Sequence, residues 1–343
     1  MSAQKDSCYL IGESHSECQD YAIHQNIKFN NHREKKLNDS FNVLVLCDGC
    51  SSSHEFTKKV DFGVKIVAWN IIRTLENEFG RYLTGNEENF FWNWNEKQKE
   101  RFSREFSIDL LYKLYEFKGK YQFPIESLDA TMLVAIEYRG HILQFTLGDG
   151  VCFYKLKDGT KRYQITNFNS NAPFYFSYIL DGRRLGGYLD EFGHNSCTTE
   201  TFDITNGNIE KINYRLFFIN DYDLDLIEFT NPPSVGTLDG LRDYNLLCNV
   251  YARFMTPNIQ ILEDVDFIGI SSDGISTFVQ DGNNFIDEHQ MIKDMFDYKN
   301  FVGEFVKRKI NFYKTKKWQK NNIKHLDDIS FASLKVIDSE SRQ

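Results

Sequence analysis

Short apolar runs bounded by polar or turn residues recur along most of this chain, and they predict β-strands. The run at 43–46, which leads into Cys47 and Asp48, is too short for a buried helix and is typical of a strand buried on both faces. Two strands around a polar loop are predicted within residues 9–23. The other strands are predicted at 129–138, 142–147, 151–156, 162–166, 214–219, 266–272 and 329–337. Turn signals between the runs at 129–166 indicate an antiparallel meander.

Helical periodicity replaces these short runs in four segments. From Asp61 onward, apolar residues recur every three or four positions and predict one buried face, formed by Val64, Val67, Ala68, Ile71, Ile72 and Leu75. A second helix is predicted at 96–118, with an apolar side formed by Phe102, Phe106, Leu110, Leu114 and Phe117. Two further helices are predicted at 288–296 and 299–318. The polar stretches 30–39 and 51–59 are predicted to be loops.

The order of the elements favours one α+β domain over residues 1–343. Strands, helices, strands, helices and a last strand follow one another, which suggests two antiparallel sheets with helices outside them. Residues 167–264 hold one clear predicted strand and much polar, aromatic sequence, so we expect an irregular insertion there. No internal repeat or low-complexity linker divides the chain.

Charge and composition argue against several classes of protein. The net charge is −9 and the pI is near 5.5, which argues against binding a nucleic-acid backbone and is compatible with recruiting cations. No apolar run approaches the length of a membrane span, and the first residues carry no apolar signal core. We therefore expect a cytoplasmic protein that binds neither nucleic acid nor membranes. The seven cysteines are scattered, so a disulfide framework is not expected.

Acidic residues stand at the ends of strands that are far apart in the sequence: Asp48, Asp149, Asp273 and Asp327. One Asp-Gly after a strand is an ordinary turn. Four such acids favour a shared, oxygen-lined metal site instead. Hard cations such as Mg²⁺ and Mn²⁺ prefer carboxylate, carbonyl and water oxygens. Two such ions about 3.5–4 Å apart can clamp a phosphoryl group for in-line attack.

Six residues are candidates for this site before any family is considered. Asp48, Asp273, Asp327 and the carbonyl of Gly49 are candidate metal ligands. Asp20, where the second strand begins, is a candidate to hold a water molecule at the metal. Asp149 is a candidate for an additional or weaker site beside Asp273.

Five motifs, in order along nearly the whole chain, resemble those of metal-dependent protein phosphatases of the 2C type, particularly their bacterial branch. The motifs are residues 12–20, residues 48–51 with 61–63 behind them, residues 129–131 with 148–150, residues 272–274 and residues 327–330. The resemblance implies a four-layer αββα sandwich. It also implies an enzyme that removes phosphate from Ser and Thr side chains and uses two or three Mn²⁺ or Mg²⁺ ions. A phosphoprotein substrate or its kinase is the implied partner, and residues 167–264 would contain the family's substrate-facing flap.

The resemblance also implies a role for each acid. Asp48 would bridge both metals, with the Gly49 carbonyl beside it. Asp273 and Asp327 would complete one metal, and Asp149 with Asp273 would form a third site.

Three positions depart from the family pattern. Gln19 stands where the eukaryotic pattern has a Glu, His15 stands at the place of the phosphate-contacting arginine, and Cys50 stands where a proton-donating histidine often follows the Asp-Gly. His54, slightly downstream, is a candidate to replace that histidine. The departures leave a second hypothesis open, in which a weak or inactive relative serves as a metal- or phosphoprotein-binding regulatory module.

Other patterns in the sequence favour less specific interpretations. Cys47 and Cys50 have the spacing of a thiol redox motif, but no second pair and no βαβ context accompany them, so Cys47 is interpreted as core. The stretch with Arg183, Arg184 and two glycines at 186–187 is interpreted as a surface turn rather than an anion-binding loop. The basic run at 307–317 is interpreted as a solvated helix face that helps attract an acidic phosphosubstrate, and the aromatic residues at 90–94 as a satellite of the core.

Overall fold

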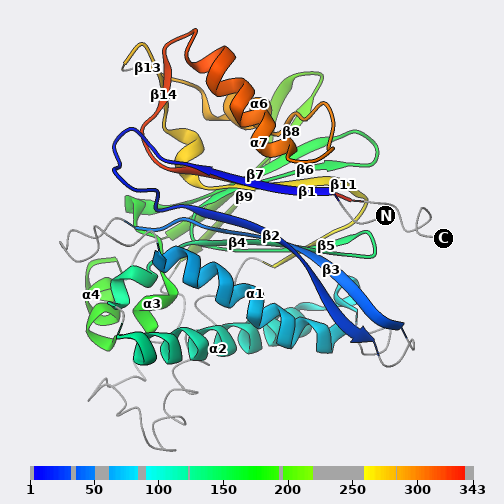
Figure 1. Cartoon of the computed structure of the whole chain (residues 1–343), viewed down its shortest axis with the longest axis vertical. Helices are drawn as coiled ribbons and strands as arrows, with labels where there is room; N and C mark the ends of the chain where they lie inside the picture. Colours follow the sequence, from blue (N-terminus) through cyan, green and yellow to red (C-terminus); the bar gives the residue numbers. More distant parts are fainter. Residues whose placement is uncertain are drawn as a thin grey trace, which may run out of the picture.

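Two large antiparallel sheets face each other in the computed structural model, which describes residues 4–31, 36–50, 62–83, 90–122, 124–192, 196–218, 259–282 and 284–336 (Figure 1). Among these residues, seven strands form the first sheet in the order β1 (Gln4–Leu10), β15 (Ile329–Lys335), β11 (Val265–Ser271), β6 (Gly150–Leu156), β7 (Lys161–Phe168), β8 (Ser196–Thr205) and β9 (Asn208–Phe218). The second sheet has the order β10 (Gln260–Leu262), β5 (His141–Leu147), β4 (Met132–Tyr138), β3 (Lys36–Cys47) and β2 (Tyr21–Asn31).

Helices cover the outer face of each sheet. In Figure 1, α1 (Phe62–Leu83) and α2 (Glu96–Tyr121) lie below the five-stranded sheet, and α6 (Glu288–Phe296) and α7 (Phe305–Phe312) lie above the seven-stranded sheet. A π-helical turn, Tyr313–Trp318, continues α7. The remaining described elements are α3 (Phe176–Ile179), α4 (Gly182–Phe192), four 3-10 turns (Phe91–Asn93, Ile125–Leu128, Asn169–Asn171 and Asp273–Ser276) and a small sheet of β13 (Asn284–Phe285), β12 (Phe278–Gln280) and β14 (Ile323–His325).

The buried side chains confirm the four-layer αββα arrangement. One apolar cluster lies between the two sheets and includes Leu44 and Leu133 from one sheet with Ile268 and Leu334 from the other. A second cluster joins the five-stranded sheet to α1 and α2, and a third joins the seven-stranded sheet to α6 and α7. The α+β sandwich predicted from the sequence is therefore correct.

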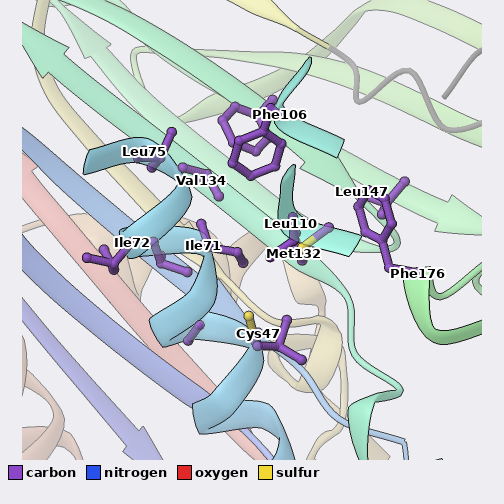
Figure 2. Packing of buried hydrophobic residues seen from close by; sticks show 14 of the residues in the cluster. Cys47, Ile71, Ile72, Leu75, Phe106, Leu110, Met132, Val134, Leu147 and Phe176 are labelled. Carbon is purple, nitrogen blue, oxygen red and sulfur yellow. The ribbon is translucent and has the colours of Figure 1, made fainter. Parts of the chain in front are cut away.

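The strand at 43–46 is buried on both faces, as its unbroken apolar pattern predicts. Val43, Val45 and Cys47 belong to the cluster with α1 and α2, whereas Leu44 and Leu46 belong to the cluster between the sheets. Successive side chains of a strand point to opposite faces, so both faces of β3 must be apolar. Figure 2 shows Cys47 packed among residues of α1 and β4. Burial raises the pKa of the Cys47 thiol, which agrees with a core role.

The predicted helices are confirmed, with changes at their ends. The predicted apolar face of α1 is buried. Helix α2 begins after Asn95, whose side chain accepts a hydrogen bond from the Gln98 N–H in a capping box, and it extends three residues past the predicted end. The helix predicted from residue 299 begins only at Phe305. Phe91 and Trp94 are buried in the core with α1 and α2, so the prediction for residues 90–94 is also confirmed.

Three predictions of irregular structure were wrong. Residues 30–39 contain the end of β2 and the start of β3, because the hairpin continues to pair as far as Asn31 and Lys36. Residues 182–192 form α4 rather than a surface turn, since the Asp181 side chain accepts hydrogen bonds from the N–H groups of Arg183 and Arg184 at the helix start. The stretch 167–264 contains a long β8–β9 hairpin among its described residues.

Residues 51–59, 61 and 338–343 lie outside the described residues, as does Cys248.

The predicted meander is divided between the two sheets at Asp149. Strands β4 and β5 pair in one sheet, whereas β6 and β7 pair in the other. Gly148 and Gly150 flank the crossing with φ values of +96° and +135°, which L side chains rarely adopt. A Cβ atom on Gly150 would lie 2.8 Å from the carbonyl oxygen of Ser271. The two glycines thus let the chain change sheets in one residue and leave Asp149 at the corner.

No helix of the described residues is long and apolar enough to cross a membrane.

We expect Gly150→Ala to destabilise the fold more than Gly159→Ala. Both glycines have positive φ, so each substitution costs about 1–2 kcal/mol in backbone strain. Only the Cβ at 150 also meets neighbouring atoms closer than 3.0 Å, whereas the site at 159 is open. Overpacking adds about 1–3 kcal/mol at Gly150. Urea unfolding of the two variants measures the difference, and equal losses would show that the crossing has room to adjust.

Candidate active site

Strand pairing brings the predicted acids to one end of the two sheets. Asp20 precedes β2 and Asp48 follows β3, and the register pairs Tyr21 with Cys47, so the two acids are neighbours. Asp149 precedes β6 and Asp273 follows β11, and the register pairs Val151 with Ser271. Asp327 lies in the connection that leads into β15, which pairs with β11. The antiparallel register therefore gathers residues that are up to 307 positions apart.

Asp48 lies between Asp20 and Asp273. Its carboxyl group is within hydrogen-bonding reach of both of these acids, so acids from the two sheets are in contact. Burial, followed by the negative charges of Asp20 and Asp273, raises the pKa of Asp48 well above its usual value. Two carboxyl groups in contact need either a shared proton or a cation, because each otherwise offers only acceptor oxygens.

Asp20 is the most enclosed member of the group. Its side chain is 2% exposed, and Oδ2 accepts a hydrogen bond of 2.6 Å from the Ser272 hydroxyl. Its other oxygen, Oδ1, is buried and has no hydrogen-bond donor among the described residues. Burial raises the pKa of Asp20 to about 7, although contacts with Asp48 and Ser272 act in the opposite direction. A buried carboxylate oxygen without a donor is costly and is open to a cation or a water molecule.

Asp149 and Asp327 complete the group at its two sides. Asp149 is 5% exposed, and burial followed by the charge of Asp273 raises its pKa to about 7. Asp327 is more exposed, with 49% of its side chain accessible, and burial followed by the charge of Asp273 also raises its pKa. Asp273 is thus close to Asp48, Asp149 and Asp327.

The chemistry of these residues fits a hard divalent cation. Carboxylate oxygens dominate the group, one of them lacks a donor, and burial raises the pKa values of four of the acids, Asp20, Asp48, Asp149 and Asp327. In the part of the chain that the structure describes, no three His, Cys, Asp or Glu side chains are already spaced as a metal cage. The carboxyl groups instead contact one another, and a cation would replace these contacts with ion–oxygen bonds.

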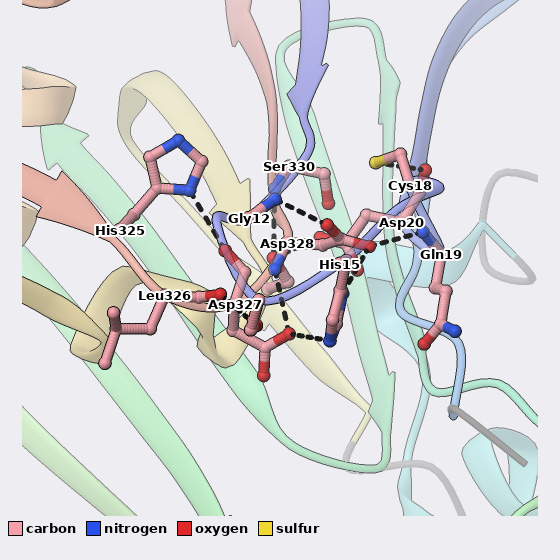
Figure 3. Close-up of polar contacts among 12 residues, drawn as sticks. Gly12, His15, Cys18, Gln19, Asp20, His325, Leu326, Asp327, Asp328 and Ser330 are labelled. Atoms are coloured by element: carbon pink, nitrogen blue, oxygen red, sulfur yellow. Dashed lines mark hydrogen bonds and ion pairs between the residues drawn. The ribbon is translucent and has the colours of Figure 1, made fainter. Parts of the chain in front are cut away.

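The loop that carries Asp20 is fastened to the segment that carries Asp327. The N–H groups of Glu13 and Ser14 each donate a 3.1 Å hydrogen bond, to the carbonyl oxygens of His325 and Leu326. A Cβ on Gly12 would lie 2.4 Å from the carbonyl carbon of Asp327, so the two backbones approach closely. Figure 3 shows the loop lying along this segment.

Asp328 is the centre of this fastening. It is 2% exposed, its Oδ1 accepts a 2.7 Å hydrogen bond from the Gly12 N–H, and its Oδ2 accepts another from the Gln19 N–H (Figure 3). The carboxylate therefore closes both ends of the loop at 12–19. Since Asp20 follows directly, Asp328 fixes the position of Asp20 relative to Asp327.

His15 is held between two carboxylates at the rim of the site. Its Nδ1 lies 3.1 Å from Oδ2 of Asp328, and its Nε2 lies 3.5 Å from Oδ1 of Asp327 (Figure 3). The imidazole is 22% exposed, so one edge can be reached from solvent. His15 thus lies next to Asp327 and Asp328, while the second predicted histidine, His54, lies outside the described residues.

Gly49 allows the segment after Asp48 to lie against two neighbours. Its N–H donates a 3.2 Å hydrogen bond to the carbonyl of Gln19, and it forms an isolated bridge with Ala130. A Cβ at this position would lie 2.7 Å from the Gln19 carbonyl oxygen. Only a glycine fits here without movement of the backbone, and Asp48 is thereby kept next to Asp20.

Two polar groups to which the sequence assigned no role lie beside the acids. Asp129 is 6% exposed and forms a two-pronged ion pair with Arg184, one arm of which measures 3.0 Å. The Asp129 carbonyl accepts a 3.3 Å hydrogen bond from the N–H of Cys50. Arg184 is therefore structural in this arrangement and ties α4 to the segment after Asp48.

Tyr175 is the second such group. Its hydroxyl is hydrogen-bonded to the side chain of Cys50. Burial raises the pKa of Tyr175, and the charges of Asp149 and Asp48 raise it further. Because Tyr175 stands in an aromatic stretch at 174–178, the sequence alone did not distinguish it from a core residue.

We expect Asp328→Ala to destabilise the metal-free protein more than Asp327→Ala, although the residues are adjacent. Removing Asp328 leaves the buried Gly12 N–H and the partly buried Gln19 N–H without acceptors, which costs at least about 2 kcal/mol. Removing the more exposed Asp327 loses one acceptor but also relieves repulsion with Asp273, so the change stays within about 1 kcal/mol. Urea unfolding in the presence of a chelator measures both. Asp328→Asn, which keeps one acceptor oxygen, should lie between them, and a larger loss for Asp327→Ala would contradict the assignment.

Comparison with known proteins supports the resemblance seen in the sequence. The family model of protein phosphatase 2C matches residues 14–178, a stretch that includes Asp20, Asp48 and Asp149 but ends before Asp273 and Asp327. No curated protein matches the chain.

Solved structures that resemble the chain include three phosphatases. The serine/threonine phosphatase Stp1 from Staphylococcus aureus has 14% identity and a TM-score of 0.45, with 98% of this chain and 96% of that chain covered. The serine-threonine phosphatase 2C from Toxoplasma gondii has 11% identity and a TM-score of 0.46, with 98% and 95% covered. The catalytic domain of the phosphatase PstP, solved in complex with 2 manganese ions, has 9% identity and a TM-score of 0.42, with 98% and 99% covered. The family model thus matches slightly less than half of this chain, and the solved structures resemble it only at low identity.

Proposed function

We propose that this protein is a Mn²⁺- or Mg²⁺-dependent phosphatase that hydrolyses phosphoserine and phosphothreonine monoesters. The observation that carries the proposal is the contact of Asp48 with both Asp20 and Asp273, which brings strand ends of the two sheets into one acidic site. The family match over residues 14–178 supports the same reaction. A phosphoprotein is the proposed substrate, its kinase is a proposed partner, and the cytoplasm is the proposed location.

Each acid has a proposed role in holding the ions. Asp48 and the carbonyl of Gly49 would bind at the centre, with Asp273 and Asp327 completing one metal. Asp149 lies beside Asp273 and would serve a third ion where one binds. Bound Mn²⁺ or Mg²⁺ supplies a Lewis acid for phosphoryl oxygens and lowers the pKa of water.

Asp20 and His15 would act on the water and on the phosphate. The unpartnered Oδ1 of Asp20 can accept a hydrogen bond from a water molecule and orient it, while Ser272 holds the other oxygen in place. In its protonated form, His15 would donate from Nε2 to a phosphate oxygen while Asp328 faces its Nδ1 and orients the ring. Such positioning is a substantial part of catalysis, since a phosphoryl group must be aligned with the attacking water.

The decisive experiment is hydrolysis of p-nitrophenyl phosphate by the purified protein with Mn²⁺. We expect turnover that a chelator abolishes. Asp48→Ala and Asp273→Ala should each lower kcat/KM by more than about 100-fold, because even residues behind metal ligands contribute 10–100-fold. Glu210→Ala, an exposed acid on β9, is the matched control and should keep full activity. Full activity in a chelator, or in Asp273→Ala, would refute the metal-dependent reaction.

Metal binding can be measured separately from turnover. We expect Mn²⁺ at about 100 times its Kd to stabilise the native protein by about 2.7 kcal/mol and to raise its melting temperature, because the unfolded chain lacks the site. Asp48→Ala should abolish this shift, and Glu210→Ala should keep it. Metal binding without turnover of any phosphopeptide would favour the regulatory-module hypothesis. That hypothesis arises because Gln19 and Cys50 depart from the residues of the family pattern. No metal-dependent shift in the unmodified protein would exclude the metal-dependent reaction and leave only a module that binds phosphoproteins without metal.

A further inference from the structure

One segment carries a charge opposite to that of the rest of the chain. Residues 299–324, here called the basic segment, contain nine Lys or Arg residues and a single acid, Glu304. Its formal charge is therefore +8, whereas the whole chain has −9, so the other 317 residues together carry −17. A local charge of this size against an acidic background creates a distinct electrostatic surface.

The fold exposes these charges on one side of an anchored helix. Helix α7 buries Val306 and Ile310 in the apolar cluster of the seven-stranded sheet, and Trp318, at the end of the π-helical turn Tyr313–Trp318, packs against Phe278 and His325 of the small sheet. The basic residues alternate with these anchors and face outward. The exposed ones are Lys299, Lys307, Arg308, Lys314, Lys316, Lys320 and Lys324.

Only part of this charge is neutralised within the protein. Lys307 pairs with Glu304 at 3.2 Å, Lys317 with Asp294 at 3.5 Å and Lys324 with Glu13 at 2.8 Å. Four further lysines form no ion pair with the described residues: Lys299, Lys314, Lys316 and Lys320. Unpaired lysines that are exposed and close in sequence leave a positive field available to a ligand.

The basic segment leads directly to the acidic site. The Trp318 ring lies 5.8 Å from the ring of His325, and the Nδ1 of that histidine lies 3.0 Å from the carbonyl oxygen of Asp327. Three residues of chain join Lys324 to Asp327, a span of at most about 11 Å. An extended peptide covers the same span with about three residues. Two exposed acids contact this path: Glu13, already paired with Lys324, and Asp281, whose side chain accepts a 3.3 Å hydrogen bond from Asn322.

We propose that the basic segment binds the flanks of the substrate, so that this protein prefers phosphopeptides with acidic residues three or more positions from the phosphorylated Ser or Thr. The inference rests on the proposed phosphatase function and adds the substrate class to it. Lys314, Lys316 and Lys320 supply the unneutralised charge, and Lys324 adjoins the site. Acidic flanks gain from this field, basic flanks are repelled by it, and salt screens both effects.

The test uses three phosphoserine peptides that differ only at positions three to six on each side of the phosphoserine, which carry Glu, Ala or Lys. With Mn²⁺ and about 20 mM NaCl, we expect kcat/KM for the Glu peptide to exceed that for the Lys peptide by about tenfold or more. At about 500 mM NaCl the ratio should fall toward one. Equal values for the three peptides at low salt, from a protein that does turn them over, would overturn the inference and leave the phosphatase function intact.

Charge reversal locates the preference. In the triple variant Lys314→Glu, Lys316→Glu, Lys320→Glu, the ratio should fall to about one or below, because the field changes sign, while kcat/KM for p-nitrophenyl phosphate stays unchanged. The control is Lys97→Glu, Arg104→Glu, Lys120→Glu, which changes the net charge equally on α2, in the opposite outer layer (Figure 1), and should keep the preference.

Two further outcomes separate this inference from its competitors. Equal loss of the preference in both triple variants would overturn the local assignment in favour of overall charge. Tighter binding of the unmodified protein to vesicles with one quarter phosphatidylserine than to the Glu peptide would also overturn it, because the basic segment would then serve a membrane surface. Absence of turnover on p-nitrophenyl phosphate and on all peptides refutes the proposed function. In that case, fluorescence anisotropy of the Glu and Lys peptides still tests the preference, and equal binding overturns it.

Discussion

Mutual repulsion among buried carboxylates is the constraint that shapes this end of the molecule. Asp48 touches Asp20 and Asp273, and burial raises the pKa values of Asp20 and Asp48 because the charged forms lose their hydration. Left to themselves, such groups would separate. They stay together because each is attached to a strand end or to a loop with little freedom to move, so the stability of the two sheets holds the acids in place. Relief comes from a proton or from a divalent cation, and only the cation leaves all the acids ionised.

The two sheets and the Asp328 contacts hold the acids in different ways. Within each sheet, the antiparallel register sets neighbouring strand ends side by side, as with Tyr21 opposite Cys47. Between β14 and β15, however, the chain is a short connection rather than a strand. There the buried Asp328 accepts hydrogen bonds from two backbone N–H groups of the loop at 12–19. These bonds provide the rigidity that hydrogen bonds between strands provide within each sheet. Adjacent aspartates thus divide two tasks, since Asp327 faces the site and Asp328 holds the backbone.

Sequence patterns predicted the elements that bury either one face, as α1 does, or both faces, as β3 does. The apolar face of α1 and the run that forms β3 are buried as their periodicity requires. The β8–β9 hairpin was missed because β8 contains four Thr residues and only two long apolar residues, Phe202 and Ile204, and long-range pairing with β7 decides its structure. The acids were found because each interrupts an apolar run. Asp328 was not assigned a role, since nothing local distinguishes an acid that binds distant N–H groups from an acid that binds a metal. The same holds for Asp129, whose partner Arg184 lies 55 residues away.

The contrast between the acidic site and the basic segment has a physical consequence for any phosphorylated ligand. A phosphate group carries about −1.5 to −2 charges at neutral pH, so acids that are not balanced by cations repel it. In the proposed reaction, a bound cation would therefore do more than supply chemistry, because it would change the local field from one that repels the phosphate to one that attracts it. The charge of the basic segment does not depend on a bound metal, since no carboxylate of the site pairs with Lys314, Lys316 or Lys320. In the proposed scheme, these lysines would attract the remainder of the ligand whether or not the metal is bound. Binding of the phosphate would then require the metal, whereas binding of the flanking residues would not.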